Sequence, residues 1–180
     1  MPDVIKNQPF SQVLIEPTSH LDLEPILRIE QESFSAPWTR KMLEAEMNGN
    51  PFGYLSTARF NYEGCEGIER GAVVGYVCFW IVFEELRFMN LAVERAARRR
   101  GIARELVRHA LAVGWERGAV RAVLEVRASN VAARGLYERV GFRQIAVRAK
   151  YYTNPTEDAL LMGMDALETQ FETKATVKGW

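Results

Sequence analysis

LEVRASNVAARGLYERVGF, residues 124–142, joins a strand pattern to a capped helix. Its first residues alternate as a strand does and carry one carboxylate, Glu125. Asn130 is a good N-cap for the helix that follows, and Gly141 is a good helix stop. Because the strand leads directly into the helix, we expect Glu125 and Tyr137 to border one cleft as an acid/base pair on a rigid frame.

Both side chains also have ordinary structural explanations. Glu125 shares a strand face with Arg127, so a salt bridge between these two residues would account for its position. Tyr137 is equally compatible with a half-buried core aromatic. The two structural explanations become less convincing when they are taken together. Helical spacing from Asn130 places Tyr137 two turns into a helix that directly follows the strand of Glu125, so both side chains can border one cleft.

The segments on either side predict a mixed α/β domain. The apolar run 72–83 is typical of a strand buried on both faces, and a tight turn at Glu84–Glu85 would join it to the next strand. The order is strand, two helices, three strands, helix, strand, helix, two strands. Strands are expected near 13–15, 54–60, 72–83, 86–93, 122–126, 142–152 and 159–164, and helices near 23–34, 39–47, 101–117 and 130–140.

Length and composition favour one ordinary globular domain. The chain has 180 residues, of which 48% are hydrophobic, enough to bury a sizeable core. We expect a flexible leader at 1–10, a single domain at 11–167 and a loosely ordered tail at 168–180. The stretch 61–71 is acidic and contains glycine, so it is expected to be a loop.

Charge and cysteine usage exclude several classes of protein. Lysine plus arginine and aspartate plus glutamate balance at 23 each, so no global field draws the chain to nucleic acid or membrane. Cys65 and Cys78 have no paired spacing, and with two histidines they argue against a disulfide scaffold or a zinc cluster. The start of the chain has no signal-peptide core, and the run 72–83 is shorter than the roughly 20 residues of a membrane helix. A cytoplasmic location is the expectation.

An arginine run precedes the helix expected at 101–117. Arg98, Arg99, Arg100 and Arg104 surround Gly101, where unpaired N–H groups of a helix start would meet a phosphate. The strand–helix–strand segment 86–126 forms one βαβ crossover, a common place for phosphate ligands. The run lacks the endings of a P-loop or a dinucleotide fingerprint. A solvated surface patch is the alternative, and a nucleic-acid binder is disfavoured by the charge balance.

The segment Arg98–Ala103 matches the pattern Q/R-x-x-G-x-G/A. By this pattern the chain resembles the GNAT superfamily of acetyl-CoA-dependent N-acetyltransferases, over roughly residues 14–164. More specific segments make it similar to the RimI-type ribosomal-protein-alanine N-acetyltransferases within that superfamily: Pro37–Trp38, Leu124–Asn130, Leu136–Glu138, Gly141–Phe142, Tyr151–Tyr152 and Glu157–Ala159. The resemblance implies a twisted, mostly antiparallel sheet of about seven strands, a βαβ acetyl-CoA-binding crossover and four helices.

The resemblance also implies roles for individual residues. Glu125 would be the general base and Tyr137 the general acid. Many GNAT enzymes place a catalytic glutamate at the position of Asn90, and an amide cannot serve as a base. Acetyl-CoA, with no metal, would be held by Leu91, Ala92, Val93, Arg98, Arg99, Arg100, Gly101, Ile102, Ala103, Arg104, Asn130 and Tyr137. The acceptor would meet Trp38, Asn90, Tyr151 and Tyr152, which are alternatively plain core or rim residues.

The activity implied is direct acetyl transfer to the α-amino group of a protein. The expected acceptor is the N-terminal alanine of the eighteenth small-subunit ribosomal protein, with neither nucleic acid nor membrane as a direct partner. Two alternatives stay open: transfer to a lysine side chain or a small amine on the same fold, and a non-catalytic acyl-CoA-binding module. Attack requires a deprotonated amine, whose usual pKa is about 7.7 to 8.0, so a base is needed at neutral pH.

Overall fold

The computed structural model describes residues 13–60 and 71–167. The expected leader at 1–10, the tail at 168–180, nearly all of the 61–71 loop and Cys65 lie outside the described residues. The strands are β1 (Val13–Pro17), β2 (Gly53–Phe60), β3 (Val73–Val82), β4 (Glu85–Val93), β5 (Arg121–Arg127), β6 (Arg143–Thr153) and β7 (Thr156–Met164). The helices are α1 (Leu23–Ser33), α2 (Arg40–Asn48), α3 (Ile102–Glu116) and α4 (Val131–Val140), with short 3-10 turns at His20–Asp22 and Arg95–Ala97.

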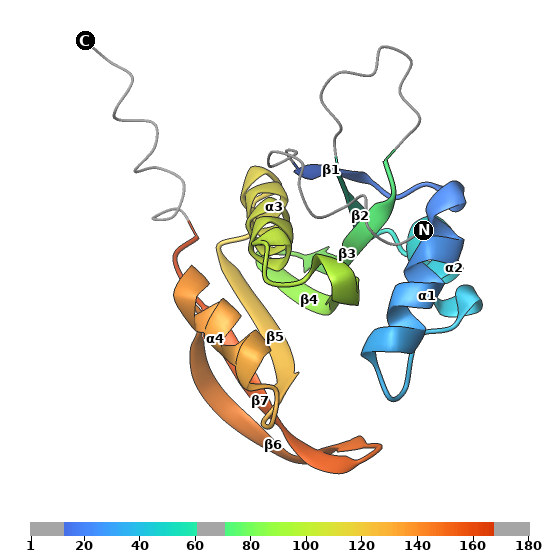
Figure 1. Ribbon diagram of the computed structural model, residues 1–180. Coiled ribbons are helices and arrows are strands. Elements are labelled where there is room, and N and C mark those ends of the chain that lie inside the picture. The colour runs from blue at the N-terminus through green and yellow to red at the C-terminus, as the bar shows by residue number, and fades with distance from the viewer. Residues whose placement is uncertain (1–12, 61–70, 168–180) are drawn as a thin grey trace.

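The strands form one seven-stranded sheet in the order β1-β2-β3-β4-β5-β7-β6. Neighbours pair antiparallel throughout except for β4 and β5, which run parallel and are connected through α3. Parallel neighbours require such a crossover, because the chain must return to the starting edge of the sheet. The predicted fold class, the order of strands and helices along the chain and the βαβ crossover are therefore confirmed (Figure 1).

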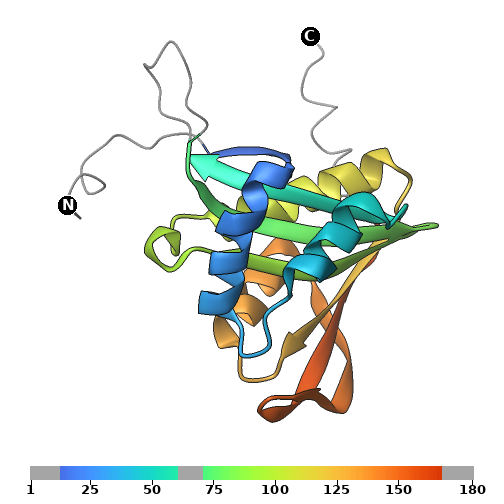
Figure 2. The ribbon, with the colours of Figure 1, turned by 90° about the vertical axis from the view of Figure 1, so that its right-hand side faces the viewer.

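Helices cover both faces of the sheet. In Figure 2, α1 and α2 lie in front of the first strands, whereas α3 and α4 lie behind the sheet. Each face has its own core: residues of α1 pack with Tyr76, Cys78 and Ala92 on one side, and residues of α3 pack with Phe79 and Leu86 on the other. The β6–β7 hairpin extends away from this double-sided core (Figure 2).

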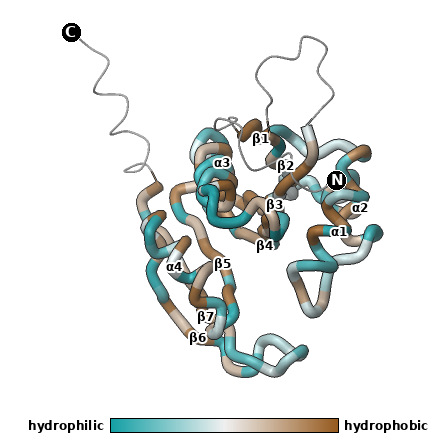
Figure 3. Tube along the Cα trace, viewed as in Figure 1, coloured by the Kyte–Doolittle hydropathy of each residue, from teal (hydrophilic) through white to brown (hydrophobic). Residues whose placement is uncertain are grey.

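Local sequence pattern explains the central elements. Burial along β3 is nearly continuous, as expected for a strand with helices on both faces. Figure 3 shows the hydropathy of each residue along the chain. Helix α3 buries Ile102, Leu106, Ala110 and Leu111 along one stripe. At about 25 cal/mol per Å² of apolar area, each fully buried leucine or isoleucine of such a stripe contributes roughly 1.5–3 kcal/mol.

Helix ends follow the expected capping residues. The Thr39 side chain accepts a hydrogen bond from the Met42 N–H, and the Asn130 side chain accepts one from the Ala133 N–H at 3.1 Å. Gly141 ends α4 in the left-handed conformation. The predicted turn at Glu84–Glu85 is wrong by one residue, because β4 already begins at Glu85 and Phe83 takes the positive φ of the turn.

Within residues 13–60 and 71–167, the chain contains no helix of the length and apolarity that a bilayer crossing requires.

Candidate active site

The cleft begins where β4 and β5 stop pairing. Their ladder consists of three residue pairs, from Glu85 with Arg121 to Arg87 with Val123. Beyond Arg87, β4 stays with β3 and β5 stays with β7, so the two strands diverge. The divergence opens the sheet between its two halves and leaves backbone groups of β4 without a strand partner on that side.

The register of β4 shows which backbone groups face the opening. The Glu94 N–H donates to the Val74 carbonyl at 2.8 Å, so alternation turns the N–H groups of Leu91 and Val93 away from β3 and toward the cleft. A bulge at the adjoining position, where Asn90 pairs with Cys78 and Phe88 with Phe79, inserts Met89 as an extra residue. Polar backbone groups therefore line the cleft at the predicted thioester position.

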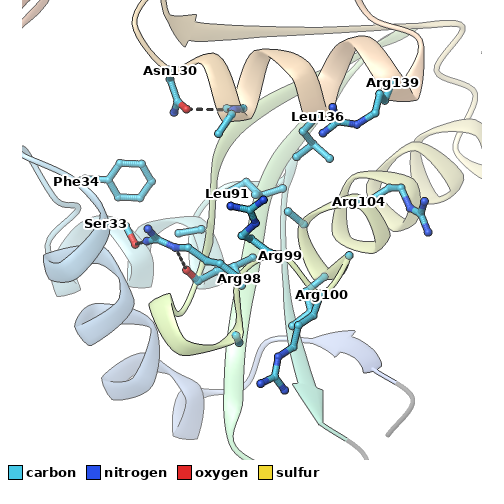
Figure 4. Close-up of a pocket in the computed structure, with 18 residues that line it drawn as sticks. Ser33, Phe34, Leu91, Arg98, Arg99, Arg100, Arg104, Asn130, Leu136 and Arg139 are labelled. Carbon is cyan, nitrogen blue, oxygen red and sulfur yellow. Dashed lines mark hydrogen bonds between the residues drawn. The ribbon is translucent and has the colours of Figure 1, made fainter. Parts of the chain in front are cut away.

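A pocket of about 940 Å³ occupies one side of this opening (Figure 4). It lies between the end of β4, the start of α3 and one face of α4, with the end of α1 closing it. Its lining includes every predicted cofactor-binding residue except Tyr137. Residues that the sequence did not indicate also line it: Ser33, Phe34, Ala97, Ala132, Ala133, Leu136 and Arg139.

The loop before α3 fits a polyanion. Gly101 caps α3 with φ of 85°, and an added Cβ there would meet open space. The first N–H groups of α3 thus face the pocket together with the positive end of the helix dipole. Arg99 lines the pocket and has no ion-pair or hydrogen-bond partner among the described residues, so its charge remains available to a phosphate.

The other arginines of the run are partly engaged. Arg98 donates from Nε to the Val93 carbonyl at 2.9 Å and from Nη2 to Ser33 Oγ at 3.0 Å, which ties the loop to α1 and β4 (Figure 4). The Arg100 guanidinium lies 5.8 Å from the centre of the Phe60 ring. Arg98 therefore shapes the loop, a role that the sequence pattern alone did not indicate.

Glu125 lies on the face of the sheet opposite α3, with its side chain 12% exposed. Its Oε1 accepts a hydrogen bond from Arg87 Nη1 at 3.3 Å and forms an ion pair with Arg148 Nη1 at 3.1 Å. The alternative of an ion pair with Arg127 is wrong, because Arg127 instead pairs with Glu157 at 3.2 Å and lies 4.1 Å over the Tyr152 ring. Glu125 is thus a carboxylate shared by two guanidinium groups at the cleft.

Tyr137 is buried in the aromatic core between the sheet and α4. Its ring centroid lies 6.4 Å from that of Phe88 and 5.7 Å from that of Phe142. Burial, with a smaller effect of Tyr152, raises its pKa to about 12. Tyr137 is not among the residues that line the pocket.

The remaining predicted acceptor residues lie on the face of the sheet that carries Glu125. Trp38 is half-buried against the α1 core, and the rings of Tyr151 and Tyr152 are nearly perpendicular at 5.2 Å. Ser35 Oγ donates to the Asn154 carbonyl at 2.5 Å, and Asn154 Nδ2 donates to the Ser35 carbonyl at 3.3 Å. These bonds join the α1–α2 loop to the tip of the β6–β7 hairpin and close one edge of the cleft.

Glu30 is a buried carboxylate that the sequence analysis missed. It is 0% exposed on α1, and burial raises its pKa to about 7. Its two oxygens accept from the Trp38 N–H at 2.6 Å and from Asn90 Nδ2 at 2.7 Å. A charged residue next to Ile26 and Ile29 on the apolar stripe of a helix was the available signal.

Comparison with known proteins decides the family. The family model described as Acetyltransferase (GNAT) family matches residues 23–142 of the chain. The chain belongs to the GNAT acetyltransferase family. It is therefore an N-acetyltransferase, as the motif at Arg98–Ala103 predicted.

Three similar proteins are named as ribosomal-protein-alanine N-acetyltransferases. The [ribosomal protein bS18]-alanine N-acetyltransferase of Escherichia coli K12 is 30% identical over 145 residues, covering 79% of this chain and 90% of its own. A Bacillus subtilis strain 168 protein with a provisional name of the same kind is 34% identical over 142 residues, covering 78% and 87%. The crystal structure of the Escherichia coli ribosomal-protein-S18-alanine N-acetyltransferase matches with a TM-score of 0.72 at 28% identity, covering 86% and 94%.

Proposed function

We propose that this GNAT enzyme transfers the acetyl group of acetyl-CoA to the α-amino group of an N-terminal alanine, that of ribosomal protein bS18. The observation that carries the proposal is the closed acceptor edge, where Ser35 and Asn154 join the α1–α2 loop to the β6–β7 hairpin. A chain end can be threaded under such a bridge, whereas an internal loop would need the bridge to open. The names of the similar enzymes support the same acceptor.

The donor half suits the pantetheine and pyrophosphate of CoA. The edge of β4 at Leu91 and Val93, which has no strand partner on its β5 side, would align with the amide-bearing pantetheine arm as a strand partner does. Gly101 and the first turn of α3 would hold the pyrophosphate, with Arg99 and Arg104 adding charge. Leu136 and Ala132 of α4 give the opposite wall an apolar surface.

The proton roles follow from the two environments. Glu125, polar and half-buried between guanidinium groups, would accept a proton from the ammonium or amine. Tyr137 holds its proton at neutral pH, because its pKa is raised to about 12, and would donate it to the departing sulfur. One proton moves from nitrogen to sulfur in a turnover, so the proton gained at Glu125 replaces the one lost at Tyr137. Because the proposed substrate is a ribosomal protein of the cytosol, the enzyme is expected in the cytoplasm.

A peptide panel analysed by mass spectrometry tests the proposal. The panel contains the bS18 N-terminal sequence, variants of it beginning with serine and methionine, and the alanine peptide with a blocked amino group and an internal lysine. We expect rapid acetylation of the free alanine peptide and almost none of the blocked one. Acetylation of lysine in the blocked peptide, with the free alanine untouched, would favour a lysine acetyltransferase. Binding of acetyl-CoA with no product from any peptide would favour a non-catalytic module.

A further inference from the structure

The outer end of the β6–β7 hairpin is attached to the sheet through a short ladder. The register of the hairpin is irregular between Arg148 and Tyr152. Beyond this irregularity two residue pairs remain, Tyr152 with Glu157 and Thr153 with Thr156. A two-stranded ribbon of this length is marginally stable by itself. The position of the hairpin tip therefore depends on contacts with other elements.

Arg127, the last residue of β5, makes such contacts. Its Nη2 donates to the Asn154 carbonyl at 2.8 Å, and its Nη1 donates to the Pro155 carbonyl at 3.1 Å and to Glu157 Oε2 at 3.2 Å. Asn154 and Pro155 are the two turn residues between the last ladder pair of the hairpin. The same guanidinium lies 4.1 Å over the centre of the Tyr152 ring. One side chain of β5 thus binds both carbonyls of the turn and stacks on the hairpin behind it.

Glu157 fixes this guanidinium in turn. Its Oε1 accepts from the Ser129 N–H at 2.5 Å, while its Oε2 binds Arg127. The bond from Ser129 and then the contact with Arg127 lower the pKa of Glu157, so the carboxylate is charged at neutral pH. Ser129 directly precedes Asn130, which caps α4 and lines the donor pocket. Arg127 is therefore held between the hairpin tip and the start of a helix.

The Asn154 carbonyl connects Arg127 to the acceptor edge. This oxygen accepts from Ser35 Oγ at 2.5 Å as well as from Arg127, so both of its lone pairs are used. The outer end of the hairpin meets the α1–α2 loop at this point (Figures 1 and 2). Because hydrogen bonds from a charged guanidinium are stronger than those from a neutral hydroxyl, Arg127 holds this carbonyl more firmly than Ser35 does.

We propose that Arg127 is a positioning residue that sets the acceptor selectivity of the enzyme. It holds the hairpin tip against the α1–α2 loop, so that a chain end is threaded under the closed bridge and an internal lysine is excluded. This inference rests on the proposed transfer to an N-terminal α-amino group. Arg127 is not a catalytic residue, because its guanidinium is engaged by the hairpin and acts through Asn154.

The variant Arg127→Ala tests the proposal, since it leaves the ion pairs of Glu125 with Arg87 and Arg148 in place. We expect KM for the alanine peptide to rise about tenfold or more, with kcat at saturating peptide within about threefold of the wild type. The ratio of kcat/KM for the blocked lysine peptide to that for the alanine peptide should rise about tenfold. The proposal fails if the KM or this ratio stays within about twofold of the wild type, or if kcat falls with KM unchanged.

Arg121→Ala is the matched control. Arg121 lies at the other end of β5 and pairs with Glu85 at 3.0 Å, so the substitution also removes an ion-paired arginine of this strand. It should keep the wild-type KM and the wild-type ratio. A loss of selectivity equal to that of Arg127→Ala would overturn the proposal, because the effect would not depend on the hairpin tip.

Chemical rescue separates positioning from a general structural role. In Arg127→Ala, the vacated position is lined by the Glu157 carboxylate, the two turn carbonyls and the Tyr152 ring, which together suit a guanidinium. Methylguanidinium chloride should lower the peptide KM of this variant at least about threefold in a saturable way, whereas methylammonium chloride at the same ionic strength should not. Equal effects of the two salts would overturn the role assigned to the planar guanidinium.

Hydrogen exchange measured by mass spectrometry tests the anchor without turnover. Backbone amides of residues 151–157 should exchange faster in Arg127→Ala than in the wild type, while those of β3 keep their rates. If the wild type acetylates only lysine peptides, the proposed function fails, and exchange still decides whether Arg127 positions the tip. Unchanged exchange at the tip would overturn the proposal even if the alanine peptide is the acceptor. Faster exchange throughout the sheet would also overturn it, because Arg127 would then support the whole fold.

Discussion

The two sides of the cleft treat their charges differently. On the donor side, Arg99 has no ion-pair partner in the described part of the chain. Gly101, at the start of α3, has open space where a Cβ would lie. On the acceptor side, Glu125 is paired with two arginines, and Arg127 is paired with Glu157. Unpaired positive charge suits a polyphosphate that is recognised by electrostatics. Internally neutralised charge suits a peptide end that is recognised by shape and hydrogen bonds.

The chemistry itself offers the largest test of this comparison. Glu125→Gln and Tyr137→Phe remove the proposed base and acid, so each should lower kcat by roughly 10²–10⁴-fold. Steady-state kinetics with the alanine peptide measures the loss, and calorimetry should find CoA affinity unchanged. The exposed neighbour Glu138 provides a matched control, since Glu138→Gln should behave as wild type. Full activity in both catalytic variants would remove the assigned proton roles.

The buried carboxylate between the two sides should impose a pH dependence on stability. Folding raises the Glu30 pKa from 4.5 to about 7, so the folded state binds this proton more tightly than the unfolded state does. Its stabilising effect is complete below about pH 4.5 and is lost as pH rises through about 7, a change of about 3 kcal/mol in the free energy of unfolding. Urea unfolding of the wild type and Glu30→Gln across this range measures the difference. The exposed Glu32→Gln on the same helix should keep the wild-type slope.

Donor-side charge should control cofactor affinity. Arg99→Ala removes an arginine of the pocket, and because Arg99 has no partner among the described residues, the substitution leaves no other side chain unpaired. We expect the Kd for CoA to rise roughly tenfold. The effect should shrink at high salt, because exposed charges are screened. Arg108→Ala, also on the surface but outside the pocket, should leave the Kd unchanged. If both substitutions weaken CoA binding equally, the general electrostatic field of the protein, and not a specific phosphate site, attracts the cofactor.

The closed acceptor edge should have the smallest effect. Ser35→Ala removes the hydroxyl that donates to the Asn154 carbonyl, so the bridge keeps one of its two bonds. An exposed neutral hydrogen bond contributes about 0.5–1.5 kcal/mol, and we expect KM for the alanine peptide to rise roughly threefold with CoA affinity unchanged. Faster acetylation of an internal lysine in this variant would support the bridge as the basis of selectivity. If neither the preference for the α-amino group over lysine nor the KM for the alanine peptide changes, the bridge has no role in acceptor selection.

Local patterns predicted the fold because they suffice to define its elements. The stripe of α3, the apolar run of β3 and the caps at Thr39, Asn130 and Gly141 each depend on neighbours a few residues away. The turn before β4 was misplaced, because Phe83 adopts a positive φ that its residue type does not suggest.

Site contacts were less predictable because they join distant strands. The arginines that hold Glu125 come from β4 and β6, and no spacing within β5 identifies them. The inward turn of Arg98 depends on where Ser33 ends α1. The raised pKa of Glu30 depends on burial under another layer. The sequence pattern can identify such residues as candidates, but their partners depend on how elements that are far apart in the sequence pack together.

The short β4–β5 ladder has a further consequence for how the molecule opens. Strands β1–β4 and β5–β7 form two groups that are each contiguous in sequence, and three parallel residue pairs join the groups in the sheet. Local unfolding costs least where the fewest ladder bonds must break. Amide protons at this joint should therefore exchange with solvent before those of β3. The opening that admits substrates is therefore also the part of the sheet that we expect to exchange its amide protons first.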